Sequence, residues 1–213
     1  MTTTSAPRPR RKPPRRYHHG DLPRALLHEA VRTIQRQGVE GLTLRSVAQA
    51  LGVSRTAMYR HFVDKSALLA AVAREGFRTL RLELLAARAQ LREDPAAMGV
   101  AYVRFAVTNP SYYRVMFGGF VERCARDAEL EAEASGAFEV LVEALVAQQQ
   151  AGRLRQDEPR QLARFIWAIV HGIARLAIDG QLQGPDEDAE RLTRYALGRV
   201  RTGIAAPTPQ SVA

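Results

Sequence analysis

Residues 43–65 read TLRSVAQALGVSRTAMYRHFVDK, a pattern that predicts two short helices joined by a tight turn. Thr43 and Ser54 carry hydroxyl oxygens that can accept hydrogen bonds from the free backbone N–H groups of a helix's first turn. Gly52 lies between the two helices, and glycine enters the left-handed backbone conformation without steric cost. Asp64 is a further capping residue, so the second helix is expected to end there. The segment therefore predicts a helix-turn-helix unit.

The second helix of this unit presents side chains suited to a DNA groove. Arginine donates bidentately to guanine O6 and N7, and a threonine methyl contacts thymine. Arg55 and Thr56 are therefore predicted to read bases. Tyr59, His61 and Lys65 are suited to hold phosphates, which fix the register of a protein on DNA. An αα-hairpin with a solvated polar face is the alternative, and the pattern alone leaves it open.

Four motifs follow one another along the first third of the chain: YHHGDL at 17–22, GLTLR at 41–45, LGVS at 51–54 and MYRHFVDKSALL at 58–69. Together they resemble the N-terminal domain of the TetR family of transcriptional regulators. The resemblance implies that the first helix supports the helix-turn-helix unit, the third enters the major groove, and the fourth leads into a larger helical body. The DNA-facing side chains implied are Thr43, Arg45, Ser54, Arg55, Thr56, Tyr59, Arg60, His61 and Lys65.

Helical periodicity continues along the chain, and no strand pattern competes with it. Besides the two short helices, the pattern predicts helices at about 21–37, 65–92, 95–109, 110–117, 127–150, 159–178 and 186–200. The expected fold is all-α with about nine helices: a three-helix DNA-binding domain followed by a larger effector-binding and dimerisation domain. Its expected parts are a disordered basic arm (1–16), the helix-turn-helix domain (17–66), the helical body (67–203) and a disordered tail (204–213).

Positive charge is concentrated near the N-terminus. The chain has a net charge of +9, of which residues 1–16 contribute +6, residues 17–80 contribute +4 and residues 81–213 contribute −1. This distribution is expected when one end of a protein meets phosphate. The proline-rich arm either lies along DNA or serves as a solubilising tail, and both interpretations remain open.

Other classes of protein lack support in the sequence. No nucleotide-binding or hydrolase motif is present, so an enzyme is not expected. Cys124 is the single cysteine, which excludes an intramolecular disulfide, and no metal site or cofactor is expected. The longest apolar run, 162–178, contains Arg164, His171 and Arg175 and is predicted to be too polar to span a membrane. We therefore expect a cytoplasmic protein with no membrane partner.

Two C-terminal helices predict a homodimer. The 159–178 helix is apolar on more than one face, so one face can line the core while another needs a cover, for which a second copy is the simplest candidate. Paired with the last helix, it would form an intermolecular four-helix bundle, as in the TetR family. The predicted interface residues are Ile166, Val170, Ile173, Tyr195 and Val200.

Aromatic and soft side chains gather in the body and predict an effector pocket. The candidates are Tyr102, Phe105, Tyr113, Met116, Phe117, Trp167 and His171. The segment NPSYYRVMF at 109–117 and the spacing Trp167-x3-His171-Gly172 resemble a TetR-family C-terminal subtype named for Trp-His-Gly. Ordinary core packing is the alternative for each of these residues.

The predicted function is transcriptional regulation through double-stranded DNA. The resemblance implies a homodimeric repressor that binds a pseudo-palindromic operator and is released by an unknown small-molecule effector. The alternative is an architectural or orphan DNA-binding protein without an effector, which would lack an internal cavity.

Overall fold

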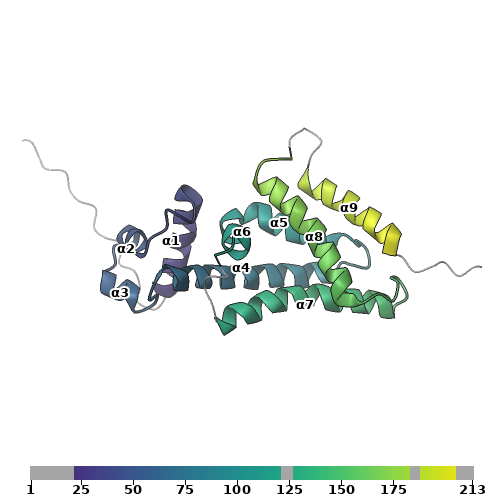
Figure 1. The fold of residues 1–213 in the computed structure, drawn as a ribbon, viewed down its shortest axis with the longest axis horizontal. Helices are drawn as coiled ribbons and strands as arrows, with labels where there is room; N and C mark the ends of the chain where they lie inside the picture. Colours follow the sequence, from purple (N-terminus) through teal and green to yellow (C-terminus); the bar gives the residue numbers. More distant parts are fainter. Residues whose placement is uncertain (1–21, 121–126, 183–187, 205–213) are drawn as a thin grey trace, which may run out of the picture.

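The computed structural model describes residues 22–120, 127–182 and 188–204. Within these ranges the chain is all-helical, as expected, and Figure 1 shows how its helices are arranged. They are α1 (Leu22–Gln37), α2 (Leu44–Leu51), α3 (Arg55–Tyr59), α4 (Lys65–Arg88), α5 (Ala97–Thr108), α6 (Pro110–Phe117), α7 (Ala128–Gln150), α8 (Pro159–Ile178) and α9 (Ala189–Ile204). The predicted basic arm, the motif at 17–21, most of the predicted tail and Cys124 lie outside the described residues.

The first three helices form one end of the molecule (Figure 1). Leu26 of α1, Val47 of α2 and Met58 of α3 are almost fully buried in a shared core. Because apolar burial contributes most of the stabilisation of so small a unit, these residues hold the three helices together. We call this unit the head.

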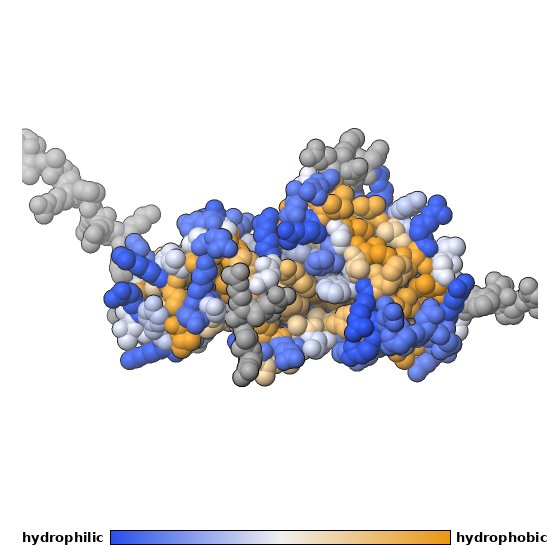
Figure 2. Space-filling view, viewed as in Figure 1, coloured by the Kyte–Doolittle hydropathy of each residue, from blue (hydrophilic) through white to orange (hydrophobic). Residues whose placement is uncertain are grey.

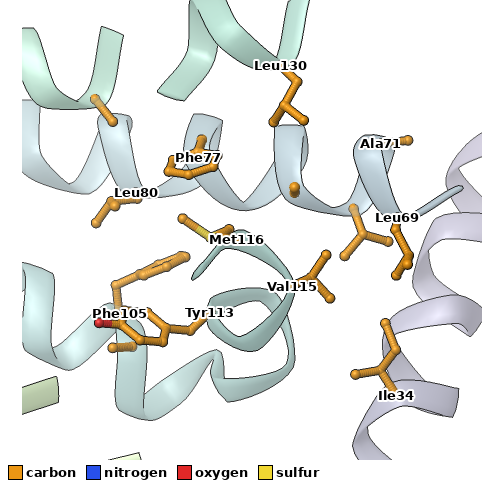
Figure 3. Packing of buried hydrophobic residues seen from close by; sticks show 14 of the residues in the cluster. Ile34, Leu69, Ala71, Phe77, Leu80, Phe105, Tyr113, Val115, Met116 and Leu130 are labelled. Carbon is orange, nitrogen blue, oxygen red and sulfur yellow. The ribbon is translucent and has the colours of Figure 1, made fainter. Parts of the chain in front are cut away.

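Helix α4 connects the head to the body. It packs against α1 at one end and against α5, α6 and α7 along its length. Its inner face carries Phe77 and Leu80, which Figure 3 shows lying near Met116 and Tyr113 of α6 and Phe105 of α5. A displacement in the body therefore has a continuous helical path to the head.

Several helix ends differ from the sequence expectation, including those of α9, which runs from Ala189 to Ile204 where 186–200 was expected. Helix α3 ends at Tyr59 and does not continue to Asp64, because His61 and Phe62 both donate their backbone N–H to Met58 O and form a turn. This turn buries the Phe62 ring, which is 8% exposed, and leaves Asp64 free to cap α4, whose Ala67 N–H it accepts at 2.8 Å. Helix α4 is also shorter than expected and ends at Arg88.

Helix α8 is, among the described residues, the one helix long and apolar enough to cross a membrane by length and composition alone. It packs on α5, α7 and α9, so part of it belongs to the protein core. Core helices meet the same length and composition criteria. Only 28% of its most apolar window is buried, and Phe165, Trp167 and Leu176 are among its exposed side chains.

Candidate functional site

Local hydrogen bonds fix the turn that presents α3. Gly52 adopts the left-handed conformation, with φ of 66°, and donates its N–H to Ala48 O and Gln49 O. The Ser54 hydroxyl then accepts the Ala57 N–H at 3.1 Å and starts α3. The Thr43 hydroxyl likewise accepts the Ser46 N–H at 3.0 Å, in a capping box at the start of α2. Both caps are formed by residues close in sequence, so the sequence could predict them.

The predicted DNA-facing side chains come together at this end of the head. Arg55, Thr56 and Tyr59 all point to solvent from α3, and Tyr59 is 54% exposed despite its size. Lys65 is half-buried, and its Nζ donates to Glu40 O at 3.2 Å. The other five members of the set are exposed: Thr43, Arg45, Ser54, Arg60 and His61.

The charge on this surface is positive. Arg45, Arg55 and Arg60 make no ion pair with any of the residues that the structure describes. Asp64, the nearby carboxylate, is engaged as the cap of α4. Three uncompensated guanidinium groups on an exposed surface attract phosphate and are free to donate to bases.

Replacing Ser54 tests whether its hydroxyl serves stability, DNA contact or both. Ser54→Ala removes the cap of α3 and is expected to lower the free energy of unfolding by about 1 kcal/mol. Ser54→Asp keeps a capping oxygen and should retain stability, but its charge should weaken DNA binding by repelling phosphate. Chemical denaturation and a DNA titration measure the two effects. Unchanged DNA binding by Ser54→Asp would place this side chain away from the phosphates.

The body contains a partly open cavity of about 400 Å³ lined by residues of α4, α5, α6, α7 and α8. This volume lies within the range typical of small-molecule sites. Most of the lining is apolar or aromatic. The lining residues are Phe77, Leu80, Leu84, Met98, Gly99, Tyr102, Phe117, Ala134, Ala137, Phe138, Leu141, Arg160, Arg164, Ile166, Trp167 and Val170.

A hydrogen-bonded network borders this cavity. Trp167 Nε1 donates to the Tyr102 hydroxyl at 3.1 Å, and the Tyr102 and Tyr113 hydroxyls lie 3.4 Å apart. The Tyr113 hydroxyl lies 2.7 Å from His171 Nδ1, closer than the 3.1 Å of the Tyr102 hydroxyl. Nδ1 of a neutral histidine accepts a single hydrogen bond, so a chain of donation from Trp167 through Tyr102 and Tyr113 to His171 satisfies all four groups.

Burial sets the protonation of this network. It raises the pKa of Tyr102 to about 12 and also raises the pKa of Tyr113. Burial, aided by the positive charge of Arg175, lowers the pKa of His171 below its ordinary value of 6.5. At neutral pH the tyrosines are therefore donors and His171 is a neutral acceptor.

Mild acid should destabilise the protein through His171. Because the folded-state pKa of His171 is depressed, the unfolded chain binds this proton first as the pH falls below 6.5. The stability present above pH 6.5 is then lost progressively down to the folded-state pKa. Denaturant unfolding of the wild type and of His171→Asn, at about pH 7.5 and pH 5.5, measures this effect as a difference in pH dependence. Identical pH dependence in the two proteins would contradict it.

The structure separates the predicted effector residues into three groups. Tyr102, Phe117 and Trp167 line the cavity, whereas Tyr113 and His171 lie behind Tyr102 in the network. Phe105 and Met116 do not line it, which corrects the prediction for both. Phe105 is fully buried in the core, and Met116 packs against Gly76 of α4, where its Sδ would lie 2.6 Å from an added Cβ.

Several cavity residues were not anticipated from the sequence. Phe138 of α7, with Arg160 and Arg164 of α8, completes the wall opposite α4 and α5. Phe138 belongs to a helical apolar stripe, Arg160 lies in the first turn of α8, and Arg164 lies between Ala163 and Phe165 one turn later. Nothing in their local spacing distinguishes a cavity wall from ordinary packing or from a solvated face.

The predicted dimer-interface residues differ in how exposed the structure leaves them. Val170 and Ile173 are 3% and 7% exposed, so their side chains lie inside the protomer, and the prediction of both as interface residues is wrong. Ile166 is half-buried and lines the cavity. Val200 is half-buried on α9, and Tyr195 is 63% exposed. Of the five, Tyr195 is the most available to a partner.

Comparisons with known proteins agree with this architecture. Residues 26–72 match the family described as bacterial regulatory proteins, tetR family, and residues 96–200 match the tetracyclin repressor-like C-terminal domain. The fold and the exposed basic surface thus define a DNA-binding regulator of transcription, a class without enzymatic function. The chain belongs to the TetR family. The narrower Trp-His-Gly subtype is not confirmed and stays a prediction.

Individual relatives cover most of the chain. The HTH-type transcriptional repressor Rv1474c of Mycobacterium tuberculosis is 32% identical over 183 residues, covering 79% of this chain and 86% of that protein. A solved structure of a protein of unknown function from Rhodococcus sp. RHA1 has a TM-score of 0.77 and 32% identity, covering 90% of this chain and 99% of that one. The TetR family regulator PfmR of Thermus thermophilus shares the fold, with a TM-score of 0.67 at 22% identity, over 83% of this chain and 97% of its own.

Proposed function

We propose that this protein is a homodimeric repressor that binds a pseudo-palindromic operator and releases it when a small molecule fills the cavity. The exposure of Arg55, Thr56 and Tyr59 on α3, beside the unpaired Arg45 and Arg60, is the observation that carries this proposal. These side chains combine base-reading and phosphate-binding chemistry on one surface. The body's near-neutral charge leaves the head as the part that meets DNA.

The outer faces of α8 and α9 support the homodimer. Phe165 and Leu176 of α8 are 53% and 39% exposed, and they lie on the same face as Gly172 between them. Figure 2 shows an apolar surface over the part of the molecule where α8 and α9 lie. Tyr195 and Gly198 are exposed on α9, and a Cβ added to Gly172 or Gly198 would meet none of the described residues within 4 Å. A second copy would cover these faces by two-fold symmetry.

Two-fold pairing would present two heads to one DNA duplex. Heads related in this way reach half-sites about 34 Å apart, or a multiple of that distance, in inverted orientation. This geometry is the physical reason for proposing a pseudo-palindromic operator.

The position of the cavity supports release by an effector. Phe77, Leu80 and Leu84 line it from α4, the helix that also packs against α1 of the head. A ligand that prefers one position of α4 would shift the population toward heads with a particular separation. The cavity therefore favours this function over an orphan or architectural protein without an effector.

Selection of bound sites from random duplexes by the full-length protein tests the operator. Enrichment of an inverted repeat with half-sites about one DNA turn apart, or a multiple of it, is expected. Enrichment of a single half-site would contradict the proposed dimeric arrangement on DNA. If no sequence were enriched, the proposal that the protein recognises a specific operator would be wrong.

A further inference from the structure

The walls of the cavity offer a ligand little hydrogen bonding. Among the described residues, Tyr102 and Trp167 are its only uncharged polar side chains, and both are engaged in the network with Tyr113 and His171. The remaining uncharged lining is aliphatic or aromatic, with Phe77, Phe117 and Phe138 among the largest groups. Such walls favour an apolar ligand body, because a polar group placed there would lose its water without gaining a partner.

The charged groups at the cavity all have one sign. Arg160 and Arg164 line it, and no acidic residue in the described part of the chain does so. Arg160 is engaged already: it pairs with Glu139 and lies 5.9 Å from the centroid of the Phe138 ring. Arg164, one helical turn further along α8, is exposed and makes no ion pair with the residues seen in the structure. One uncompensated cation therefore stands at the edge of an apolar cavity.

An unpaired guanidinium matches a carboxylate better than any neutral group. Its planar fork donates two parallel hydrogen bonds to the two carboxylate oxygens. We propose that the ligand of this cavity is an amphiphilic monoanion, with an apolar chain inside and a carboxylate bound at Arg164. This inference rests on the proposed function, because it names the chemical class of the proposed effector.

Cavity size limits how much of the ligand's chain is buried, because the cavity is partly open to solvent. A volume of about 400 Å³ corresponds to about thirteen groups of the size of a water molecule, at ~30 Å³ each. An unbranched carboxylate of about ten to fourteen carbons would fill it. Met98, Leu141 and Ile166 also line a neighbouring cavity of about 580 Å³, so a longer chain would continue between the two.

Tryptophan fluorescence can report ligand binding directly, because Trp167 is the single tryptophan of the chain and lines the cavity. The full-length protein is titrated with decanoate, 1-decanol and decyltrimethylammonium, each below its micelle concentration, while tryptophan emission is recorded. Decanoate should change the emission saturably and bind at least about tenfold more tightly than decanol, because only decanoate forms charge-assisted hydrogen bonds. The cationic probe should bind more weakly than decanol.

The Arg164→Gln variant removes the positive charge and leaves the apolar lining of the cavity in place. This variant should bind decanoate no better than decanol, while its unchanged affinity for decanol shows that the cavity is intact. Arg78→Gln is the matched control, because Arg78 is an exposed arginine of α4 outside the cavity lining, and it should keep the wild-type preference. Equal affinity of the wild type for decanoate and decanol would overturn the proposal, as would an Arg164→Gln variant that still prefers decanoate.

Operator binding measured in parallel distinguishes the proposed ligand class from the proposed release of the operator by an effector. Decanoate binding without any loss of operator affinity supports the ligand class and contradicts effector-driven release. Operator binding by a protein that ignores decanoate overturns the ligand class and leaves the DNA-binding regulator in place.

Discussion

Alanine at both Arg55 and Tyr59 should lower operator affinity by about a hundredfold to ten-thousandfold. The base contact predicted for Arg55 contributes about 1–3 kcal/mol, so its loss from both heads of a dimer costs about 2–6 kcal/mol, and loss of the phosphate contact predicted for Tyr59 adds to this cost. Both side chains are exposed in the free protein, so the free energy of unfolding should change by less than about 0.5 kcal/mol. Titration of labelled operator duplex, with denaturant unfolding alongside, measures both quantities.

Arg32→Ala is the charge-matched control for this variant. Arg32 is exposed on α1, where it pairs with Glu29, and it is not among the predicted DNA-facing residues. Its loss should reduce operator affinity only slightly. Lys65→Ala should instead weaken binding equally on all sequences and reduce the salt dependence, as expected for a phosphate contact. Operator preference that survives the Arg55 and Tyr59 exchange would remove Arg55 from base recognition.

Glutamate at Phe165 and Leu176 together should convert the protein to a monomer. Both side chains are exposed on the outer face of α8, and two carboxylates there would face their symmetry mates across the proposed interface. A light-scattering mass of 23.6 kDa, in place of twice that value, would report the monomer. Operator affinity should fall more than about a hundredfold, because one head then meets a single half-site.

Leu82→Glu is the control for the interface, since Leu82 is 51% exposed on α4, outside α8 and α9. This variant should stay dimeric and bind operator normally. Val170→Glu is unsuitable as a test, because Val170 lies in the protomer core and a buried charge would unfold the chain. A dimeric mass for the Phe165 and Leu176 variant would place the interface elsewhere.

The head could be predicted almost completely because its signals are local. Thr43 and Ser54 each cap a helix through a backbone N–H three residues ahead, and Gly52 makes its own turn. Side chains on the outer face of so short a unit have no other element to cover them, so their exposure followed from helical spacing. The end of α3 was the exception, since burial of Phe62 required the tertiary contacts of the core.

The body could be predicted as a set of helices, but the roles of its side chains could not. On α8 both Val170 and Phe165 are apolar, yet the first packs inside the protomer and the second faces solvent. Local sequence does not say which of two apolar faces will meet α5 and α7. For the same reason, the sequence did not indicate that Arg164 lines the cavity, and Phe105 was assigned to the pocket although it packs in the core.

Sequence alone determined where most helices begin and end and which side chains of the head are exposed, because capping and helical periodicity act over a few residues. Tertiary structure decided which residues line the cavity, because its walls come from five helices, α4 to α8, and its lining residues are spread along the chain from Phe77 to Val170. It also decided which face of α8 remains uncovered. Both outcomes depend on long-range packing, whose geometry is set by all the helices together.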